Sequence, residues 1–109
     1  EALLDGDLDA AIQAEAAEAA KREAREEVGI HVTDLSFFHK SVCGTTVVWD
    51  LFYFVANSFA DTTQELGEGE DIRVEAFDRE TVKKMCLDGS IQEERSALLL
   101  LRYLSSSSL

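Results

Sequence analysis

Three glutamates stand close together in the stretch "REAREEVGI", which otherwise has the composition of a helix end. Glu23 and Glu26 are three residues apart and Glu23 and Glu27 are four apart, so in an α-helix all three project near one face. Carboxylates at this spacing repel each other, and the negative end of the helix dipole disfavours them further. Two explanations stay open: a divalent cation, which prefers oxygen ligands, offsets the repulsion, or Arg22 and Arg25 neutralise an ordinary helix end.

A second acidic group, Glu68 and Glu70, lies in the sequence "GEGED" within a predicted polar loop at residues 57–71. Considered alone, these carboxylates fit a solvated loop as well as they fit a catalytic or metal site. His31 and His39 occur on strand-like segments without a partner pattern, so surface or core roles are favoured over metal ligation for both.

A helix must position the three glutamates, and residues 10–28 are rich in the strong helix formers Ala, Glu, Lys and Arg. Asp9 is a possible N-cap of this helix, and Gly29 stands where a glycine commonly ends one. Residues 1–9 are interpreted as the end of a strand followed by a turn.

The middle of the chain changes to β-branched and aromatic residues, which predict strands at residues 30–40 and at about 46–56. The second of these is apolar on both faces except at Asp50, which predicts a central strand of a sheet. The segment "IRVEAF", residues 72–77, alternates in polarity and predicts a third, short strand.

Two further helices are predicted after these strands. One begins after Asp78 as its N-cap and ends at Gly89, and an amphipathic helix at residues 91–104 precedes a frayed tail at 105–109. This order of elements indicates an α/β or α+β fold. Three or four strands are few for the helices, so we expect part of a larger fold or one protomer of a dimer.

The composition narrows the class of function. With 109 residues the chain is expected to form one small domain, and its net charge of -12 argues against nucleic acid as a partner. The longest apolar runs are far shorter than a membrane span, so no membrane association is expected. Two cysteines without metal-ligand spacing predict ordinary thiols in a reducing, intracellular compartment, and we expect a cytoplasmic protein.

The residue pattern of "REAREEVGI" resembles the core of the Nudix box, a helix motif of hydrolases that act on nucleoside diphosphate derivatives. The matching residues are Arg22, Glu23, Ala24, Glu26, Glu27, Gly29 and Ile30. The upstream half of the box departs from the family pattern, because Leu8 and Ala14 stand where the family has a glycine and a glutamate.

A longer similarity narrows the branch. The sequence from "GEGEDIRV" to "DGSIQEERSALLLLRYL" resembles the C-terminal part of the ADP-ribose and nucleoside-diphosphate-sugar pyrophosphatases, and the resemblance covers nearly the whole chain. It implies a Nudix-type mixed sheet sandwiched between helices. Residues 1–104 would form the C-terminal part of one such domain, and the N-terminal strands of the fold are expected to be missing from the chain.

The resemblance also implies roles for the acidic residues. Glu23 and Glu27 would bind Mg²⁺ or Mn²⁺, and Glu26 would be a further ligand or the base that activates water. Glu68 and Glu70 occupy the place of an acidic loop that supplies a catalytic base, and Glu70 would be a metal ligand as well.

The remaining implications concern the motif scaffold and the reaction. Arg22 would orient a glutamate through a salt bridge and Gly29 would end the motif, so both would be structural. The implied reaction is hydrolysis of the diphosphate bond of a nucleoside diphosphate sugar, first of all ADP-ribose, by a homodimer. The alternative is a catalytically inactive Nudix-fold binding or assembly module.

Overall fold

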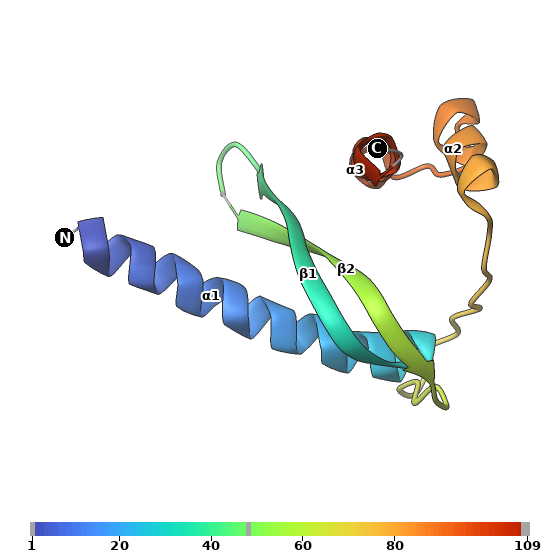
Figure 1. The fold of residues 1–109 in the computed structure, drawn as a ribbon, viewed down its shortest axis with the longest axis horizontal. Helices are drawn as coiled ribbons and strands as arrows, with labels where there is room; N and C mark the ends of the chain where they lie inside the picture. Colours follow the sequence, from blue (N-terminus) through green and yellow to red (C-terminus); the bar gives the residue numbers. More distant parts are fainter. Residues whose placement is uncertain (1, 48, 108–109) are drawn as a thin grey trace. The chain divides into compact units, whose positions relative to one another are not determined.

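The computed structural model describes residues 2–47 and 49–107, with the side chains described from residue 9 to residue 106 outside position 48. These described residues form a mixed α+β structure with three α-helices and a two-stranded antiparallel sheet (Figure 1). The elements in order are α1 (Ala2–Glu23), the π-helical turn η1 (Ala24–Val28), β1 (Ile30–Cys43), β2 (Trp49–Asp61), α2 (Arg79–Asp88) and α3 (Glu94–Ser107). They divide into two compact units, Glu1–Arg73 and Val74–Leu109.

Helix α1 begins at Ala2, so the expected strand end and turn over residues 1–9 are wrong for every one of these residues that the structure describes. Asp9 is therefore an interior helical residue and not the N-cap. Gly6 within this segment weakens a helix by only about 1 kcal/mol relative to alanine. The many alanines and long side chains of the 22-residue helix outweigh that local penalty.

The predicted helix end at Gly29 is confirmed, but the last turn before it is π-helical rather than α-helical. The backbone N–H of Gly29 donates to the carbonyl oxygen of Ala24 at 3.0 Å, which is the i→i+5 bond of a π-turn. Gly29 itself has φ 78° and ψ 39°, the left-handed conformation that glycine adopts without a steric penalty.

Strands β1 and β2 form an antiparallel hairpin whose register runs from Ile30 opposite Asp61 to Cys43 opposite Trp49. The strand predicted at residues 30–40 is confirmed. The second strand begins later than expected and continues through residues 57–61, which were predicted as loop. In the described part of the chain β2 pairs only with β1, so the prediction of a central strand is wrong.

The predicted third strand at residues 72–77 is also wrong, because this segment has no regular secondary structure. Its polarity alternates as in a strand, but a strand needs backbone partners on a neighbouring strand. No such partner is present in the regions 2–47 and 49–107.

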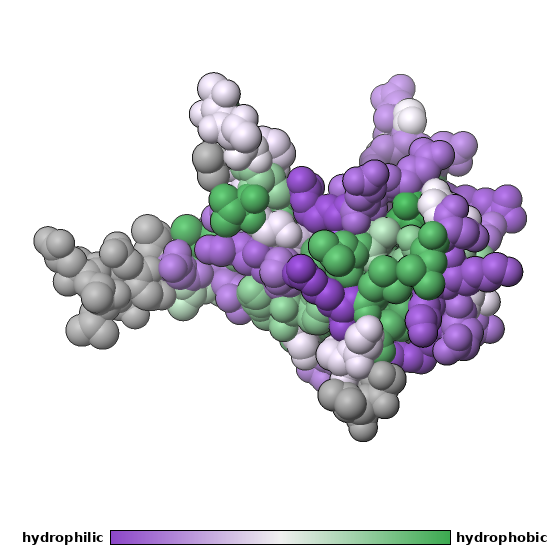
Figure 2. Space-filling view, turned by 90° about the horizontal axis from the view of Figure 1, so that it is seen from above, coloured by the Kyte–Doolittle hydropathy of each residue, from purple (hydrophilic) through white to green (hydrophobic). Residues whose placement is uncertain are grey.

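The first unit buries few side chains. Helix α1 contacts both strands, and Val32 and Cys43 on β1 are the buried apolar residues in the described part of this unit. Phe37 makes edge-to-face contacts with Phe52 and Phe54, at centroid distances of 6.4 and 6.0 Å. Other large apolar side chains remain at the surface, where Figure 2 shows hydrophobic groups among hydrophilic ones.

The second unit is a pair of helices, α2 and α3. The predicted N-cap is confirmed, since Asp78 Oδ1 accepts a hydrogen bond of 2.7 Å from the backbone N–H of Thr81. Gly89 ends α2 in the left-handed conformation with φ 86°, as predicted. The Arg79 guanidinium lies 5.7 Å from the ring centroid of Tyr103, and this cation–π contact joins the two helices.

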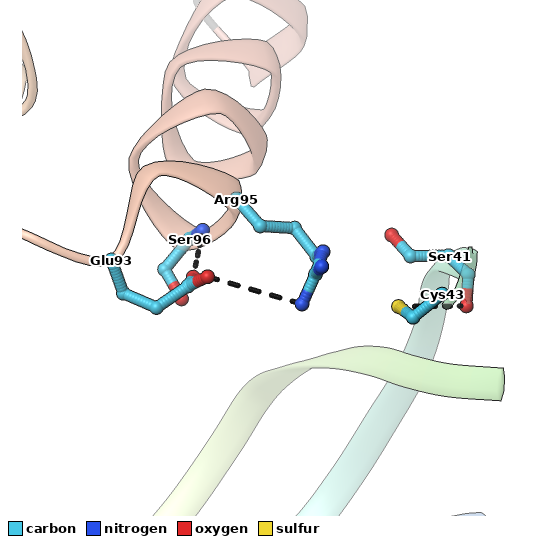
Figure 3. A network of polar contacts seen from close by, with 5 residues as sticks. All are labelled: Ser41, Cys43, Glu93, Arg95 and Ser96. Carbon is cyan, nitrogen blue, oxygen red and sulfur yellow. Dashed lines mark hydrogen bonds and ion pairs between the residues drawn. The ribbon is translucent and has the colours of Figure 1, made fainter. Parts of the chain in front are cut away.

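Helix α3 has an acidic residue at its start. The Glu93 carboxylate accepts a hydrogen bond of 2.6 Å from the Ser96 backbone N–H and lies 3.9 Å from the Arg95 guanidinium (Figure 3). The segment predicted as a frayed tail begins inside this helix, which continues to Ser107, and residues 108–109 lie outside the described part of the chain.

Two carboxyl groups at the starts of these helices have shifted pKa values. Hydrogen bonds from the Thr81 side chain and backbone lower the pKa of Asp78, and those from Ser96 lower the pKa of Glu93. In both cases the N–H groups at the helix start favour the ionised carboxylate.

Within the described residues, no helix is long and apolar enough to cross a bilayer. Both cysteines are free thiols. Cys43 is buried and its Sγ donates to the Ser41 carbonyl oxygen at 3.7 Å, as Figure 3 shows, whereas Cys86 is half-buried on α2.

Candidate functional site

The three motif glutamates lie at the change from α-helix to π-turn. Glu23 is the last residue of α1 and is exposed, whereas Glu26 and Glu27 lie in η1 and are half-buried. The expectation that all three share one face assumed a regular α-helix. A π-turn holds one more residue in each hydrogen-bonded ring, so it favours the alignment of Glu23 with Glu27 over that of Glu23 with Glu26.

The segment that follows β2 is hydrogen-bonded to this turn. The Glu65 N–H donates to the Glu26 carbonyl oxygen at 2.7 Å, and the Gln64 side-chain amide donates to the Glu27 carbonyl oxygen at 2.6 Å. The Thr62 N–H donates to the Gly29 carbonyl oxygen at 2.8 Å. These three bonds satisfy carbonyl groups that the end of a helix leaves without intrahelical partners.

Gln64 also forms a hydrogen bond to the C-terminal end of the acidic loop. Its Nε2 makes a second bond of 3.1 Å to the Ile72 carbonyl oxygen, so one amide group joins the π-turn to the two ends of the segment 64–72. Glu68 and Glu70 belong to this segment. The structure therefore connects the acidic loop directly to the glutamate-bearing turn, and the connection consists of main-chain carbonyls that accept from the Gln64 amide and the Glu65 N–H.

Within the loop, Glu70 has a local partner. Its Oε1 accepts a hydrogen bond of 2.6 Å from the Gly67 N–H, and the Glu70 N–H donates to the Gly67 carbonyl oxygen at 3.1 Å. These two bonds close a tight turn around Glu68, whose side chain is exposed. One Glu70 oxygen is thus engaged in shaping the loop, and the Glu68 carboxylate faces water.

Gly29 is required here by both conformation and space. A β-carbon at this position would lie 3.0 Å from the Thr62 carbonyl oxygen and 3.3 Å from the Gln64 Cγ. These distances are shorter than ordinary van der Waals contact. Gly29 therefore allows the post-β2 segment to lie against the turn.

The carboxylate side chains of the two acidic segments do not form a preassembled metal site among the described residues. In the described parts of the chain, no group of three or more His, Cys, Asp or Glu side chains is placed to hold a metal ion. Carboxylate oxygens are nevertheless the donor type that Mg²⁺ and Mn²⁺ accept, so Glu23, Glu27 and Glu70 suit these ions in chemical type. The structure brings together the segments that carry these residues, and the side-chain ligand set remains a prediction.

The two arginines of the motif are exposed. Among residues with described side chains, neither Arg22 nor Arg25 forms an ion pair with Glu23, Glu26 or Glu27. The neighbouring Lys21 lies 3.5 Å from Glu18, one turn earlier on α1. Within the described side chains, the ion pairs of this helix therefore do not include its last three glutamates.

Gln64 is the site residue that sequence reasoning missed. It stands in the polar run "TTQELGEGED", where nothing distinguishes one amide or hydroxyl residue from another. Its importance comes from contacts 37 and 8 residues away along the chain, which a local pattern cannot reveal.

Comparisons with protein-family models, with curated proteins and with solved structures find no match to this chain.

Proposed function

We propose that this chain carries the catalytic part of a Nudix-type pyrophosphatase, which hydrolyses the diphosphate bond of a nucleoside diphosphate sugar. The main support is the connection between the two acidic segments. The resemblance pairs the glutamate motif with the "GEGED" loop, and the segment 62–65 that leads into this loop is hydrogen-bonded to the π-turn through Gln64 and Glu65.

In this proposal Glu23, Glu27 and Glu70 hold Mg²⁺ or Mn²⁺. The ion supplies charge neutralisation of the diphosphate and a more acidic bound water. Glu26, Glu68 or Glu70 accepts the proton of the attacking water, since a carboxylate within hydrogen-bond reach is a suitable general base. Glu68 and Glu70 are both exposed whereas Glu26 is half-buried, and Glu70 Oε1 is already bonded to the Gly67 N–H, so Glu68 suits this role best.

The products would be a nucleoside monophosphate and a sugar phosphate, with ADP-ribose as the first substrate to test. The proposal includes a Nudix-type sheet sandwiched between helices, of which residues 1–104 form the C-terminal part, and a homodimer as the active species. Sedimentation analysis of the protein with and without Mg²⁺ tests whether it is a homodimer.

The decisive experiment is product analysis by chromatography after incubation of the protein with ADP-ribose, other nucleotide sugars and dinucleoside polyphosphates in Mg²⁺ or Mn²⁺. Glu27→Gln should lower kcat/KM by about 100-fold or more, because it removes a carboxylate from the metal and base cluster. Glu65→Gln is the matched control, since the described contact of Glu65 is made by its backbone and its side chain is exposed. A folded protein that turns over none of these compounds contradicts the proposal.

A binding or assembly module is the second candidate, and the exposed aromatic side chains of the hairpin favour it. Phe37, Trp49 and Phe59 are 38%, 50% and 54% exposed, which is high for large apolar groups. Calorimetry distinguishes the two functions. Binding of a nucleotide or protein partner that needs no metal and survives Glu27→Gln supports the module, and metal-dependent turnover supports the enzyme.

A further inference from the structure

A small hollow lies between the C-terminal part of α1 with η1 and the beginning of β1. Its volume is about 220 Å³, and it is lined by Glu18, Lys21, Arg22, Arg25, His31 and Val32. Four of these six side chains are basic, in a chain whose net charge is -12. We call this site the basic hollow.

Helical spacing explains why the basic residues meet there. Positions 18, 21, 22 and 25 recur at three- and four-residue intervals, so they occupy one side of the helix. The chain then turns at Gly29 and returns along β1, which brings His31 and the buried Val32 to the same place. Positions 23 and 27 lie on a different face of the helix, so the basic hollow is separate from the proposed metal site.

The charges of the hollow favour an anion. Glu18 is its only carboxylate and pairs with Lys21 at 3.5 Å, which leaves two guanidinium groups in excess. Arg22 and Arg25 are exposed, and within the described residues they form no ion pair. The planar guanidinium group presents paired N–H donors that match two oxygens of a phosphate.

The size of the hollow limits the ligand. Pockets for drug-sized ligands measure roughly 300–1,000 Å³, so a volume of about 220 Å³ is too small for a whole nucleoside diphosphate sugar. It accommodates a phosphate group with a small substituent. We infer that the basic hollow binds a phosphate dianion, either inorganic phosphate or the end of a phosphate monoester, at Arg22, Arg25, Lys21 and His31.

This inference does not depend on the proposed hydrolase activity, and a direct binding measurement tests it. Inorganic phosphate is titrated into the full chain at constant ionic strength, with sodium chloride as the reference, and the backbone amides are followed by NMR. Saturable shifts concentrated at residues 18–32 are expected. Shifts no larger than those in chloride, or spread evenly over the basic residues of the chain, overturn the inference.

Substitutions in the basic hollow should either weaken or strengthen phosphate binding, depending on the charge that they remove. Arg25→Gln should weaken phosphate binding about tenfold or more, because it removes a charge-assisted donor pair. Arg25→Lys keeps the charge but loses the paired geometry, so it should bind with intermediate affinity. Glu18→Gln should bind phosphate more tightly than the wild type, because it removes the competing carboxylate and frees Lys21.

Lys40→Gln is the control, since it removes one positive charge from an exposed position on β1 that does not line the hollow. It should leave phosphate affinity within about twofold, as expected for a charge outside the site in salt solution. Equal weakening by Lys40→Gln and Arg25→Gln would show that only net charge matters and would refute the site. Circular dichroism establishes that each variant is folded.

A lipid headgroup offers the same phosphate chemistry as a small monoester. Co-sedimentation with phosphatidylcholine vesicles, with and without phosphatidic acid, distinguishes the two sources. Binding to phosphatidic acid that free phosphate displaces and Arg25→Gln abolishes assigns the hollow to a lipid phosphate. Phosphate binding in solution without vesicle binding assigns it to a soluble monoester, and binding in neither arm overturns the inference.

Discussion

Replacing Gly29 by alanine should destabilise the junction of η1, β1 and the segment after β2. Gly29 has φ 78°, and a β-carbon there would lie 3.0 Å from the Thr62 carbonyl oxygen and 3.3 Å from the Gln64 backbone nitrogen and Cγ. The substitution therefore imposes two separate costs, one from the backbone conformation and one from crowding.

Both costs can be worked out approximately. The left-handed conformation costs an alanine about 1–2 kcal/mol, and the crowding adds about 1–3 kcal/mol, as in an overpacked core. The reduced entropy of the unfolded chain returns about 0.4–1 kcal/mol. The expected loss in the free energy of unfolding is thus about 1–5 kcal/mol, with a midpoint of about 3 kcal/mol, a large share of the stability of a small protein.

Gly69→Ala is the matched control. Gly69 has nearly the same φ, 81°, but no atom lies within 4 Å of the β-carbon position. Its substitution should cost about 1 kcal/mol, since only the conformational penalty applies.

Urea unfolding followed by the fluorescence of Trp49, the single tryptophan, reports on the hairpin unit. The difference between the two variants measures the crowding at Gly29. If Gly29→Ala and Gly69→Ala lower the free energy of unfolding equally, the close approach of Thr62 and Gln64 has no energetic weight, and our account of the junction is wrong.

Three further predictions concern the loop, the core and the helix caps. Gln64→Ala removes two part-buried hydrogen bonds and should lower the free energy of unfolding by about 1–3 kcal/mol. Amide hydrogen exchange at residues 65–72 should become faster, and unchanged exchange there would contradict the bridging role of Gln64. Val32→Ala, at a side chain 6% exposed, should cost about 2 kcal/mol in urea unfolding, whereas Val42→Ala, at one 66% exposed, should cost far less. Acidification below about pH 4 should reduce the helicity of α2 and α3 in NMR spectra, because the lowered pKa values of Asp78 and Glu93 mean that the folded state binds fewer protons than the unfolded state. Asp78→Asn keeps a capping side chain without an ionisable group, so it should weaken the acid dependence of α2, and an unchanged dependence would count against the cap as its source.

Local signals in the sequence predicted the helix ends well. Gly29 and Gly89 end helices, and Asp78 caps one, because each needs only its own conformation or a partner three residues away. The strand beginning at Ile30 was predicted for the same reason, since its β-branched and aromatic residues favour extended backbone.

Features that depend on distant partners were not predictable in the same way. The apolar character of β2 predicted a central strand, but strand position depends on which other strands are present. The alternation at residues 72–77 predicted a strand that has no pairing partner among the described residues. The α- and π-forms of the turn at Ala24–Val28 use the same residue types, so composition could not separate them.

For the candidate site, the sequence located the two acidic segments but not the link between them. The motif predicted that Glu23 and Glu27 would lie at a helix end, and they do. The Gln64 amide reaches the turn because the hairpin brings the end of β2 back beside the beginning of β1. That geometry becomes visible only when the pairing of Ile30 with Asp61 is known.

The π-turn has a consequence for how this segment tolerates insertions and deletions. A π-turn corresponds to an α-helix with one residue added, so loss of a single codon within Ala24–Val28 would leave a chain able to form a continuous α-helix to Gly29. Because the wider π-turn accommodates its extra residue locally, such a deletion would turn α1 relative to the hairpin by much less than the roughly 100° that one residue spans in a regular helix. Loss of Ala24 or Arg25 would keep all three glutamates of the motif but bring Glu26 and Glu27 one residue closer to Glu23 along the chain.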